Sequence, residues 1–179
     1  MSAEVCLRAM TWADLPMLLE WLRQPHVKAW WRDEPDDLAA IEATYGACIT
    51  GNDPTELFVV VADGRDVGMV QRYRFADEPE WCACFAGVAD VQQAAGIDYL
   101  IGDPDLVGRG VGTAAIAAIV ADTFDHSLVP TIITNVDQVN VASWRALEKA
   151  GFRRVWEGEL DSPDPSDDGP QYLYEISAQ

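Results

Sequence analysis

The first fifty residues predict a strand followed by two amphipathic helices. Polar and apolar residues alternate over residues 5–10, as they do in a strand with one buried face. Helical spacing follows in residues 12–23, where one face carries Leu15, Leu18, Leu19 and Leu22. Thr11 and Asp14 form a capping-box pattern at the start of this helix. A second helix is predicted after Pro35, with an apolar stripe made of Leu38, Ile41 and Tyr45.

The middle of the chain predicts a β-hairpin, a further strand and a long helix. Residues 57–62 and 67–73 are rich in β-branched side chains and flank an Asp-Gly-Arg-Asp turn, which favours a hairpin. Residues 76–95 lack a clear period, and we expect a loop or a short extra strand there. A strand over residues 96–101 then leads through a glycine-punctuated turn into an Ala/Ile-rich helix that ends near Asp125.

The last fifty residues predict a short strand, a helix and two closing strands, over residues 131–134, 140–150, 153–159 and 171–176. Gly151 stands just after the helix, where a glycine commonly ends one. The resulting order, β-α-α-β-β-β-α-β-α-β-β, predicts an α/β (α+β) fold in which helices cover both faces of a mixed central sheet of about six to seven strands. A chain of 179 residues suits one domain over residues 1–179.

The net charge of the chain narrows the range of partners that we expect. Twelve Lys and Arg stand against 30 Asp and Glu, a net charge of −18, so a nucleic-acid partner or an anionic membrane surface is not expected. The acidic surplus instead favours a cationic substrate. The longest apolar stretches, residues 57–62 and 114–121, are too short to span a bilayer, and no secretory signal is visible, so we expect a cytoplasmic protein. Free thiols and no metal site are expected from the spacing of Cys6, Cys48, Cys82 and Cys84.

The most informative motif is a glycine-rich turn between a strand and a helix. Gly108, Gly110 and Gly112 precede the long helix, and Arg109 stands among them. The start of a helix carries unpaired N–H groups and the positive end of a dipole, so it can bind phosphate oxygens. A tight turn that needs glycine only for its shape is the alternative. The spacing matches neither a Walker A loop nor a dinucleotide fingerprint.

Taken together, the motifs resemble those of the GNAT N-acetyltransferases, and among these the aminoglycoside 6′-N-acetyltransferases. The segments that carry the resemblance are Gly96-Ile97-Asp98, the turn at 107–113, Asn140, the Glu-Lys-Ala-Gly-Phe sequence at 148–152, and Trp30-Trp31. The similarity extends over almost the whole chain, apart from about residues 76–95 and 158–167.

The resemblance implies acetyl-CoA as the acetyl donor. The donor would lie along the strand that ends at Ile101, with its pyrophosphate on the glycine turn and its thioester oxygen held by a backbone N–H near Leu100. The residues implied to bind it are Leu100, Ile101, Gly108, Arg109, Gly110, Val111, Gly112, Thr113 and Asn140.

The acceptor implied by the resemblance is a polycationic small molecule, an aminoglycoside. Asp98 is the implied general base, or alternatively an anchor for the ammonium group, because an isolated aspartate of pKa ~3.9 is a weak base. Acids of residues 77–80 could converge on the same cleft. The residues implied to bind the acceptor are Trp31, Gln71, Tyr73, Asp98, Asp137 and Asp168.

Two departures from the family pattern keep other functions open. Leu147 occupies the position of a tyrosine that would protonate the departing thiolate, and Asn135 replaces an aspartate after Thr134. One alternative is a siderophore-pathway N-acyltransferase, although that group favours a catalytic histidine near the strand. The other is a weakly catalytic module that binds an aminoglycoside or coenzyme A. Either a monomer or a homodimer fits the sequence.

Overall fold

A seven-stranded sheet forms the centre of the computed structural model, which describes residues 3–126 and 129–178. The strand order is β1-β2-β3-β4-β5-β7-β6. Only β4 and β5 run parallel among these neighbours, so the sheet is mixed, as predicted. The strands are β1 (Val5–Ala9), β2 (Glu56–Ala62), β3 (Arg65–Arg74), β4 (Ala94–Ile101), β5 (Thr131–Asp137), β6 (Arg153–Glu159) and β7 (Pro170–Ser177).

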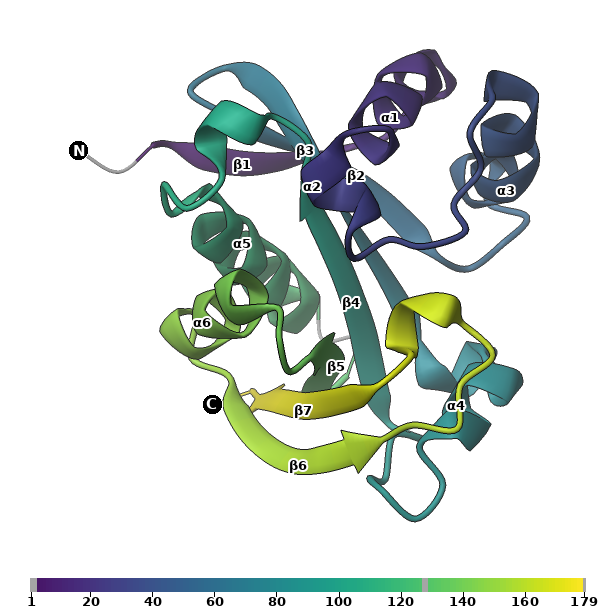
Figure 1. Cartoon of the computed structure of the whole chain (residues 1–179), viewed down its shortest axis with the longest axis vertical. Coiled ribbons are helices and arrows are strands. Elements are labelled where there is room, and N and C mark those ends of the chain that lie inside the picture. The colour runs from purple at the N-terminus through teal and green to yellow at the C-terminus, as the bar shows by residue number, and fades with distance from the viewer. Residues whose placement is uncertain (1–2, 127–128, 179) are drawn as a thin grey trace.

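Helices cover both faces of this sheet, which confirms the predicted architecture (Figure 1). On one face α5 and α6 pack over an apolar core that includes Ile97 and Ile116. On the other face α1, α2 and α3 pack over a second core that includes Leu18 and Met69. The helices are α1 (Leu15–Leu22), α2 (Pro25–Lys28), α3 (Leu38–Thr50), α4 (Pro79–Cys84), α5 (Val111–Asp125) and α6 (Val141–Lys149).

The prediction for residues 76–95 was wrong, because this segment contains the short helix α4 and the first two residues of β4. Six residues are too few to show a helical period, and tertiary packing holds the helix in place. Trp81 on α4 packs edge-to-face against Phe85, with ring centroids 6.0 Å apart. Phe85 in turn packs against Phe75, at 5.2 Å.

Two clusters centred on arginines tie distant elements together. Arg8 on β1 donates two hydrogen bonds of 2.8 Å to Asp14 and two, of 2.7 Å and 3.2 Å, to Asp66. The buried Arg72 on β3 bonds Asp122 of α5 at 2.7 Å and also contacts Glu56 of β2. These ion pairs link β1 to β3 and to the residues before α1, and they link β3 to β2 and α5.

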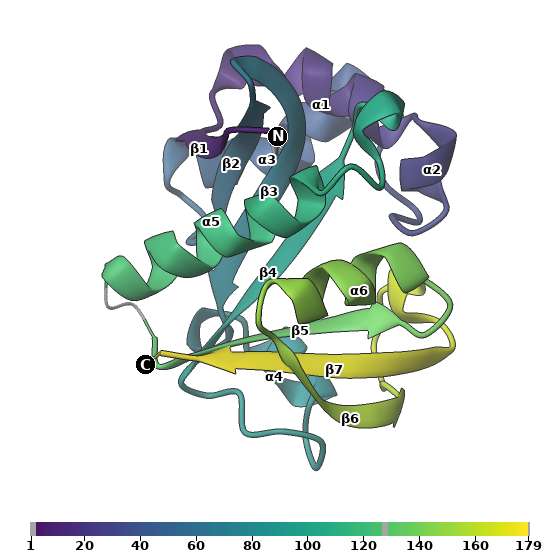
Figure 2. The same ribbon diagram turned by 90° about the vertical axis from the view of Figure 1, so that its left-hand side faces the viewer.

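The pairing between the parallel strands β4 and β5 is very short, and the candidate site lies where this pairing ends. Pairing extends only over Ala94–Gly96 with Thr131–Ile133. At the next position the hydroxyl of Thr134 donates to the carbonyl of Ile97 at 3.0 Å, and beyond it the two strands diverge (Figure 2). The edge of β4 that faces β5 therefore offers its backbone groups to a ligand.

Helix α6 begins beside this divergence. The side chain of Asn140 caps it by accepting a hydrogen bond from the N–H of Ser143, and Gly151 follows the helix at φ +100°. The start of the helix at Asn140 and the glycine after its end were predicted from the sequence; the side-chain cap was not. Within residues 3–126 and 129–178, none of the helices has the length and hydropathy that a bilayer crossing requires.

Candidate active site

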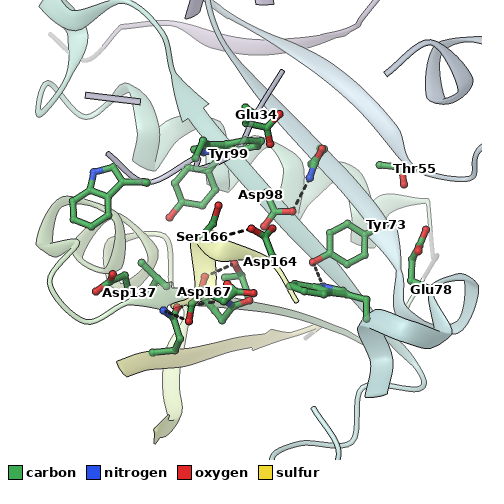
Figure 3. Close-up of a pocket in the computed structure, with 18 of the residues that line it drawn as sticks. Glu34, Thr55, Tyr73, Glu78, Asp98, Tyr99, Asp137, Asp164, Ser166 and Asp167 are labelled. Atoms are coloured by element: carbon green, nitrogen blue, oxygen red, sulfur yellow. Dashed lines mark hydrogen bonds between the residues drawn. The ribbon is translucent and has the colours of Figure 1, made fainter. Parts of the chain in front are cut away.

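A pocket of about 530 Å³ opens beside the divergence of β4 and β5 (Figure 3). Its walls come from the segment between α2 and α3, from α3, from strands β3 to β5, from α4, from the start of α6, and from the connection between β6 and β7 with the first residues of β7. None of the described residues lining it is a lysine, arginine or histidine. Its carboxylates are Glu34, Glu78, Glu80, Asp98, Asp137, Asp164 and Asp167.

Asp98 lies on β4, directly opposite Gln71 of β3 in the strand register. The side-chain amide of Gln71 donates a hydrogen bond of 2.8 Å to the Asp98 carboxylate. Burial raises the pKa of Asp98 to about 6; the Gln71 bond opposes this rise, whereas Asp167 and Asp164 add to it. Asp98 is thus a stronger base than the ordinary aspartate assumed from the sequence, and it is still ionised at neutral pH.

An aromatic wall stands next to Asp98. The indole N–H of Trp81 donates a 2.7 Å hydrogen bond to the hydroxyl of Tyr73. The Tyr73 ring covers Gly96, where an added Cβ would lie 2.2 Å from the ring, so this position needs glycine. Trp31 lines the pocket as well. Flat aromatic faces of this kind suit a sugar ring or a cation.

Further carboxylates of the pocket are partly withdrawn from solvent. Glu34 accepts a 2.8 Å hydrogen bond from Tyr45, and burial raises its pKa. Asp167 accepts hydrogen bonds of 2.6 Å from both Ser162 and Asn135, and burial raises its pKa also. Carboxylates in such surroundings favour a cationic partner, because it would relieve the cost of their burial.

The structure brings most of the predicted acceptor residues together. The residues that line the pocket are Trp31, Gln71, Tyr73, Asp98 and Asp137. Asp168 does not line it; its side chain is exposed, and the buried neighbour Asp167 is there instead. Of the acids at residues 77–80, Glu78 and Glu80 line the pocket.

Arg32 lies beside the pocket without lining it. Its backbone N–H donates to the hydroxyl of Ser166 at 3.0 Å, and its side chain donates to the carbonyl of Pro165 at 3.1 Å. The guanidinium also lies 3.8 Å from the carboxylate of Asp137. Arg32 therefore joins the segment before α3 to the connection between β6 and β7, two parts of the chain that are distant in sequence.

The sequence did not single out Glu34, Tyr45, Asp164 or Asp167. Glu34 follows Trp30-Trp31 closely, and this proximity is the one signal that could have indicated it. Asp164 and Asp167 belong to an acidic run with solubility as its ordinary explanation. Only the folded connection between β6 and β7 brings them to the pocket.

The glycine turn lies beyond the end of β4 and leads into α5. Gly108 and Gly110 have φ values of +75° and +87°, which favour glycine, and an added Cβ at either would meet no atom within 4 Å. The N–H groups of Val111, Gly112 and Thr113 belong to the first turn of α5, where a helix supplies them no carbonyl. The N–H of Arg109, in contrast, is bonded to the Leu106 carbonyl. The unpaired N–H groups in the first turn of α5 therefore fit a pyrophosphate.

The directions of the backbone N–H groups of β4 change which of them can contact the thioester oxygen. The N–H of Gly102 bonds Val67 of β3, whereas the carbonyl of Ile97 faces β5. Because backbone groups alternate sides along a strand, the N–H of Leu100 faces β3 and those of Tyr99 and Ile101 face the divergence. Tyr99 and Ile101, rather than Leu100, can therefore hold a thioester oxygen.

Two other residues also bear on the chemistry. Leu147 is fully buried in the core under α6, so the position of the family tyrosine offers no hydroxyl. The ring of His26 bonds the carbonyl of Ile101 at 2.8 Å, which assigns this histidine to the end of β4. Within residues 3–126 and 129–178, no three or more His, Cys, Asp or Glu side chains group as metal ligands would.

Comparisons with known proteins agree with this geometry. The GNAT acetyltransferase domain family matches residues 11–160. Aminoglycoside N(6′)-acetyltransferase type 1 of Klebsiella pneumoniae is 31% identical over 163 residues, which cover 89% of this chain and 78% of that protein. N-hydroxyputrescine acetyltransferase of Acinetobacter baumannii is 27% identical over 125 residues, or 70% of this chain and 57% of that protein.

A solved structure gives the same result. The crystal structure of aminoglycoside acetyltransferase AAC(6′)-Ib in complex with coenzyme A and kanamycin matches with a TM-score of 0.83 and 28% identity. The match covers 98% of this chain and 96% of that one. On the combined evidence of sequence, fold and site, the chain belongs to the GNAT acetyltransferase family.

Proposed function

We propose that this protein transfers the acetyl group of acetyl-CoA to a primary amine of an aminoglycoside, the 6′-amine. The observation that carries this proposal is the pocket itself: its described lining holds seven carboxylates and no cationic side chain, and it contains Asp98. The relatives whose names state this reaction match over most of their length.

The charge of the pocket supports a polycationic acceptor. Aminoglycosides carry several ammonium groups, and each can form a charge-assisted hydrogen bond of about 1.5–3 kcal/mol with a carboxylate. Glu34 precedes α3, Asp98 lies on β4, and Asp167 lies in the connection between β6 and β7, so together they can contact several ammonium groups of one ligand. The acidic surface also attracts such ligands from solution.

Asp98 is the base in this proposal. An aliphatic amine is protonated near neutral pH and must lose a proton before it can attack a carbonyl carbon. A carboxylate of pKa about 6 takes that proton more readily than an ordinary aspartate does. Gln71 holds the carboxylate in place through its 2.8 Å hydrogen bond.

Acetyl-CoA supplies the acetyl group as a thioester. The first-turn N–H groups of α5 and the glycine turn would hold its pyrophosphate, with Arg109 nearby as a cation. The backbone N–H of Tyr99 or Ile101 would stabilise the negative charge that develops on the thioester oxygen. Asn140 lines the pocket, and its side-chain oxygen caps α6, which leaves its NH₂ group to meet the pantetheine arm.

A thiol-release assay with acetyl-CoA and kanamycin tests the proposal. We expect turnover with kanamycin, and none with kanamycin already acetylated on its 6′-amine. Calorimetry with acetyl-CoA should show binding in the absence of an acceptor. Binding of both ligands without thiol release would instead indicate a sequestering module, and no uptake of acetyl-CoA would contradict the proposal.

A second candidate acceptor is a linear polyamine derivative. The similarity to N-hydroxyputrescine acetyltransferase favours it, and the carboxylates suit any molecule with two or more ammonium groups. The same assay with N-hydroxyputrescine and with longer acyl-CoA donors separates the two. A siderophore-type enzyme that uses a catalytic histidine is less well supported, because His26 is bonded to the Ile101 carbonyl.

We also propose that residues 1–179 form one domain in a cytoplasmic protein. The continuous sheet, which joins Val5 in β1 to Ser177 in β7, supports one domain. The free thiols of all four cysteines support a reducing compartment.

A further inference from the structure

Tyr99 connects the catalytic strand to α6. It follows Asp98 directly on β4, so its side chain lies on the opposite face of the sheet and packs against the core under α5 and α6. Its hydroxyl lies 2.7 Å from the hydroxyl of Ser143, in the first turn of α6. Tyr99 lines the pocket that contains Asp98 (Figure 3), and Ser143 lines it as well. The pair therefore stands where β4 and β5 diverge, which is the region assigned to the thioester.

The two hydroxyls leave one proton for a ligand. Two hydroxyl groups carry two protons, and their mutual hydrogen bond uses one of them. Either hydroxyl can be the donor in that bond. When Tyr99 donates, the Ser143 proton can be donated to an acceptor in the pocket. When Ser143 donates, the Tyr99 proton can be donated there instead, in competition with a long contact of 3.4 Å to the backbone carbonyl of Ser143.

Two other hydroxyls of the pocket donate their protons elsewhere. Thr134 donates to the carbonyl of Ile97 at 3.0 Å, and Tyr45 donates to Glu34 at 2.8 Å. Tyr73 packs over Gly96, whereas the Tyr99 side chain projects from the α5–α6 side of the same strand. Leu147, one helical turn beyond Ser143, is buried and carries no polar group.

We propose that the Tyr99–Ser143 pair donates a hydrogen bond to the sulfur atom of coenzyme A as the carbon–sulfur bond breaks. This role depends on the acetyl transfer proposed above. In this proposal Tyr99 of β4 and Ser143 of α6 stabilise the leaving sulfur, which the apolar side chain of Leu147 cannot do.

The step balances without a further reactant. The amine loses one proton to Asp98, and its lone pair forms the new carbon–nitrogen bond. The carbon–sulfur bond then breaks with its electron pair on sulfur, and the second amine proton passes to water. Burial raises the pKa of Tyr99, so the phenol remains protonated and stabilises the leaving thiolate by a hydrogen bond without transferring its proton. A thiol of pKa ~8.5 is a tolerable leaving group under such stabilisation.

Conservative variants test the proposal kinetically. We expect Tyr99→Phe to lower kcat about tenfold, and Ser143→Ala to lower it less, with the acetyl-CoA dissociation constant changed less than twofold. Tyr172→Phe is the matched control, because Tyr172 packs against Trp144 on the outer part of the sheet and does not line the pocket. Its kcat should equal that of the wild type. A kcat of Tyr99→Phe within twofold of the wild type would overturn the proposal.

A second measurement needs no acceptor and no turnover. The thiol of bound coenzyme A is titrated by its ultraviolet thiolate absorbance, with the desulfo-coenzyme A complex as the reference. A hydrogen bond from Tyr99 favours the thiolate, so Tyr99→Phe should raise the pKa of the bound thiol by about one unit. A lower kcat with an unchanged thiol pKa would assign Tyr99 a structural role and also overturn the proposal. Failure of the proposed function itself would appear separately, as no turnover by the wild type.

Discussion

Asp14 and Asp98 are the same residue type, each partly buried, yet their pKa values move in opposite directions. The Arg8 guanidinium binds Asp14 with two hydrogen bonds of 2.8 Å and holds its pKa well below the usual range. Asp98 faces the neutral amide of Gln71, so burial prevails and raises its pKa to about 6. A charged partner thus lowers the pKa of the structural carboxylate, whereas burial beside a neutral partner raises the pKa of the chemically reactive one.

This contrast extends to the distribution of charge over the chain. Arginines are paired with acids on the scaffold: Arg8 with Asp14 and Asp66, and Arg72 with Glu56 and Asp122. At the pocket the carboxylates face one another and neutral donors, and Arg32 reaches only the edge, 3.8 Å from Asp137. The net charge of −18 therefore includes two groups of carboxylates. Those of the scaffold are paired with arginines, whereas those of the pocket need a cation from a ligand.

The largest effect on activity is expected from replacing the Asp98 carboxylate with an amide. Asp98→Asn cannot accept the ammonium proton, so kcat should fall at least tenfold; the full loss of a general base costs about 10²–10⁴-fold. Acetyl-CoA binding should survive, because the glycine turn is untouched. Steady-state kinetics and calorimetry measure the two. Unchanged turnover would dismiss Asp98 as base and as anchor.

The substitutions Asp14→Asn and Asp98→Asn should change the free energy of unfolding in opposite directions. Asp14→Asn breaks a bidentate ion pair and should lower the free energy of unfolding by about 1–3 kcal/mol, with kcat unchanged. Asp98→Asn should raise it at pH 7.5 by up to about 3 kcal/mol, because the folded protein then no longer holds a buried charge. The gain should shrink as the pH falls through 6 towards 3.8, since wild-type Asp98 is protonated there. Urea unfolding at three pH values measures both, and the same sign for the two variants would contradict the contrast.

The sequence predicts regular elements well and the composition of the pocket only in part. Glycines that need a positive φ and a long apolar helix identified the turn and α5, because each signal is local. The helix α4 was missed, since its stability comes from contacts of Trp81 and Phe85 that no period reveals. β5 is longer than predicted, because its last residues include the polar Asn135 and Asp137, which face the pocket.

The assignment of a single acid illustrates the limit more sharply. Asp168 carries the family resemblance, yet Asp167 lines the pocket and bonds Asn135 and Ser162. A change of one residue within a turn reverses which side chain points inward, and residue type cannot indicate it. The partners of Asp98 likewise depend on the register between β3 and β4.

A smaller effect is expected from single carboxylates that contact the acceptor. Glu34→Gln should raise the KM for kanamycin about tenfold, because one charge-assisted hydrogen bond becomes a neutral one. Asp168→Asn, which removes the same charge outside the pocket, is the control and should change KM less than twofold. Added salt should raise the wild-type KM and should do so less in Glu34→Gln. Equal effects of the two variants would mean that only overall charge matters.

The smallest expected effect is a displacement of the pH profile. kcat/KM should fall about tenfold per pH unit below pH 6, because Asp98 must be ionised to act as a base. Gln71→Met removes the hydrogen bond that favours the ionised form, so the inflection should move to higher pH by about one unit. A pH–rate profile from 4.5 to 9 for both proteins tests this. A shift to lower pH would show that Gln71 does not stabilise the carboxylate.

The central claim is that the carboxylates of the pocket bind a polycation and that Asp98 lies beside its reactive amine. The most direct measurement is a crystal structure of the Asp98→Asn variant with acetyl-CoA and kanamycin, since slow turnover preserves both ligands. We predict the 6′-amine of kanamycin within hydrogen-bond distance of the residue-98 side chain, and the pyrophosphate at the first turn of α5. Kanamycin bound outside the pocket, or a first turn of α5 with no pyrophosphate on it, would contradict the account.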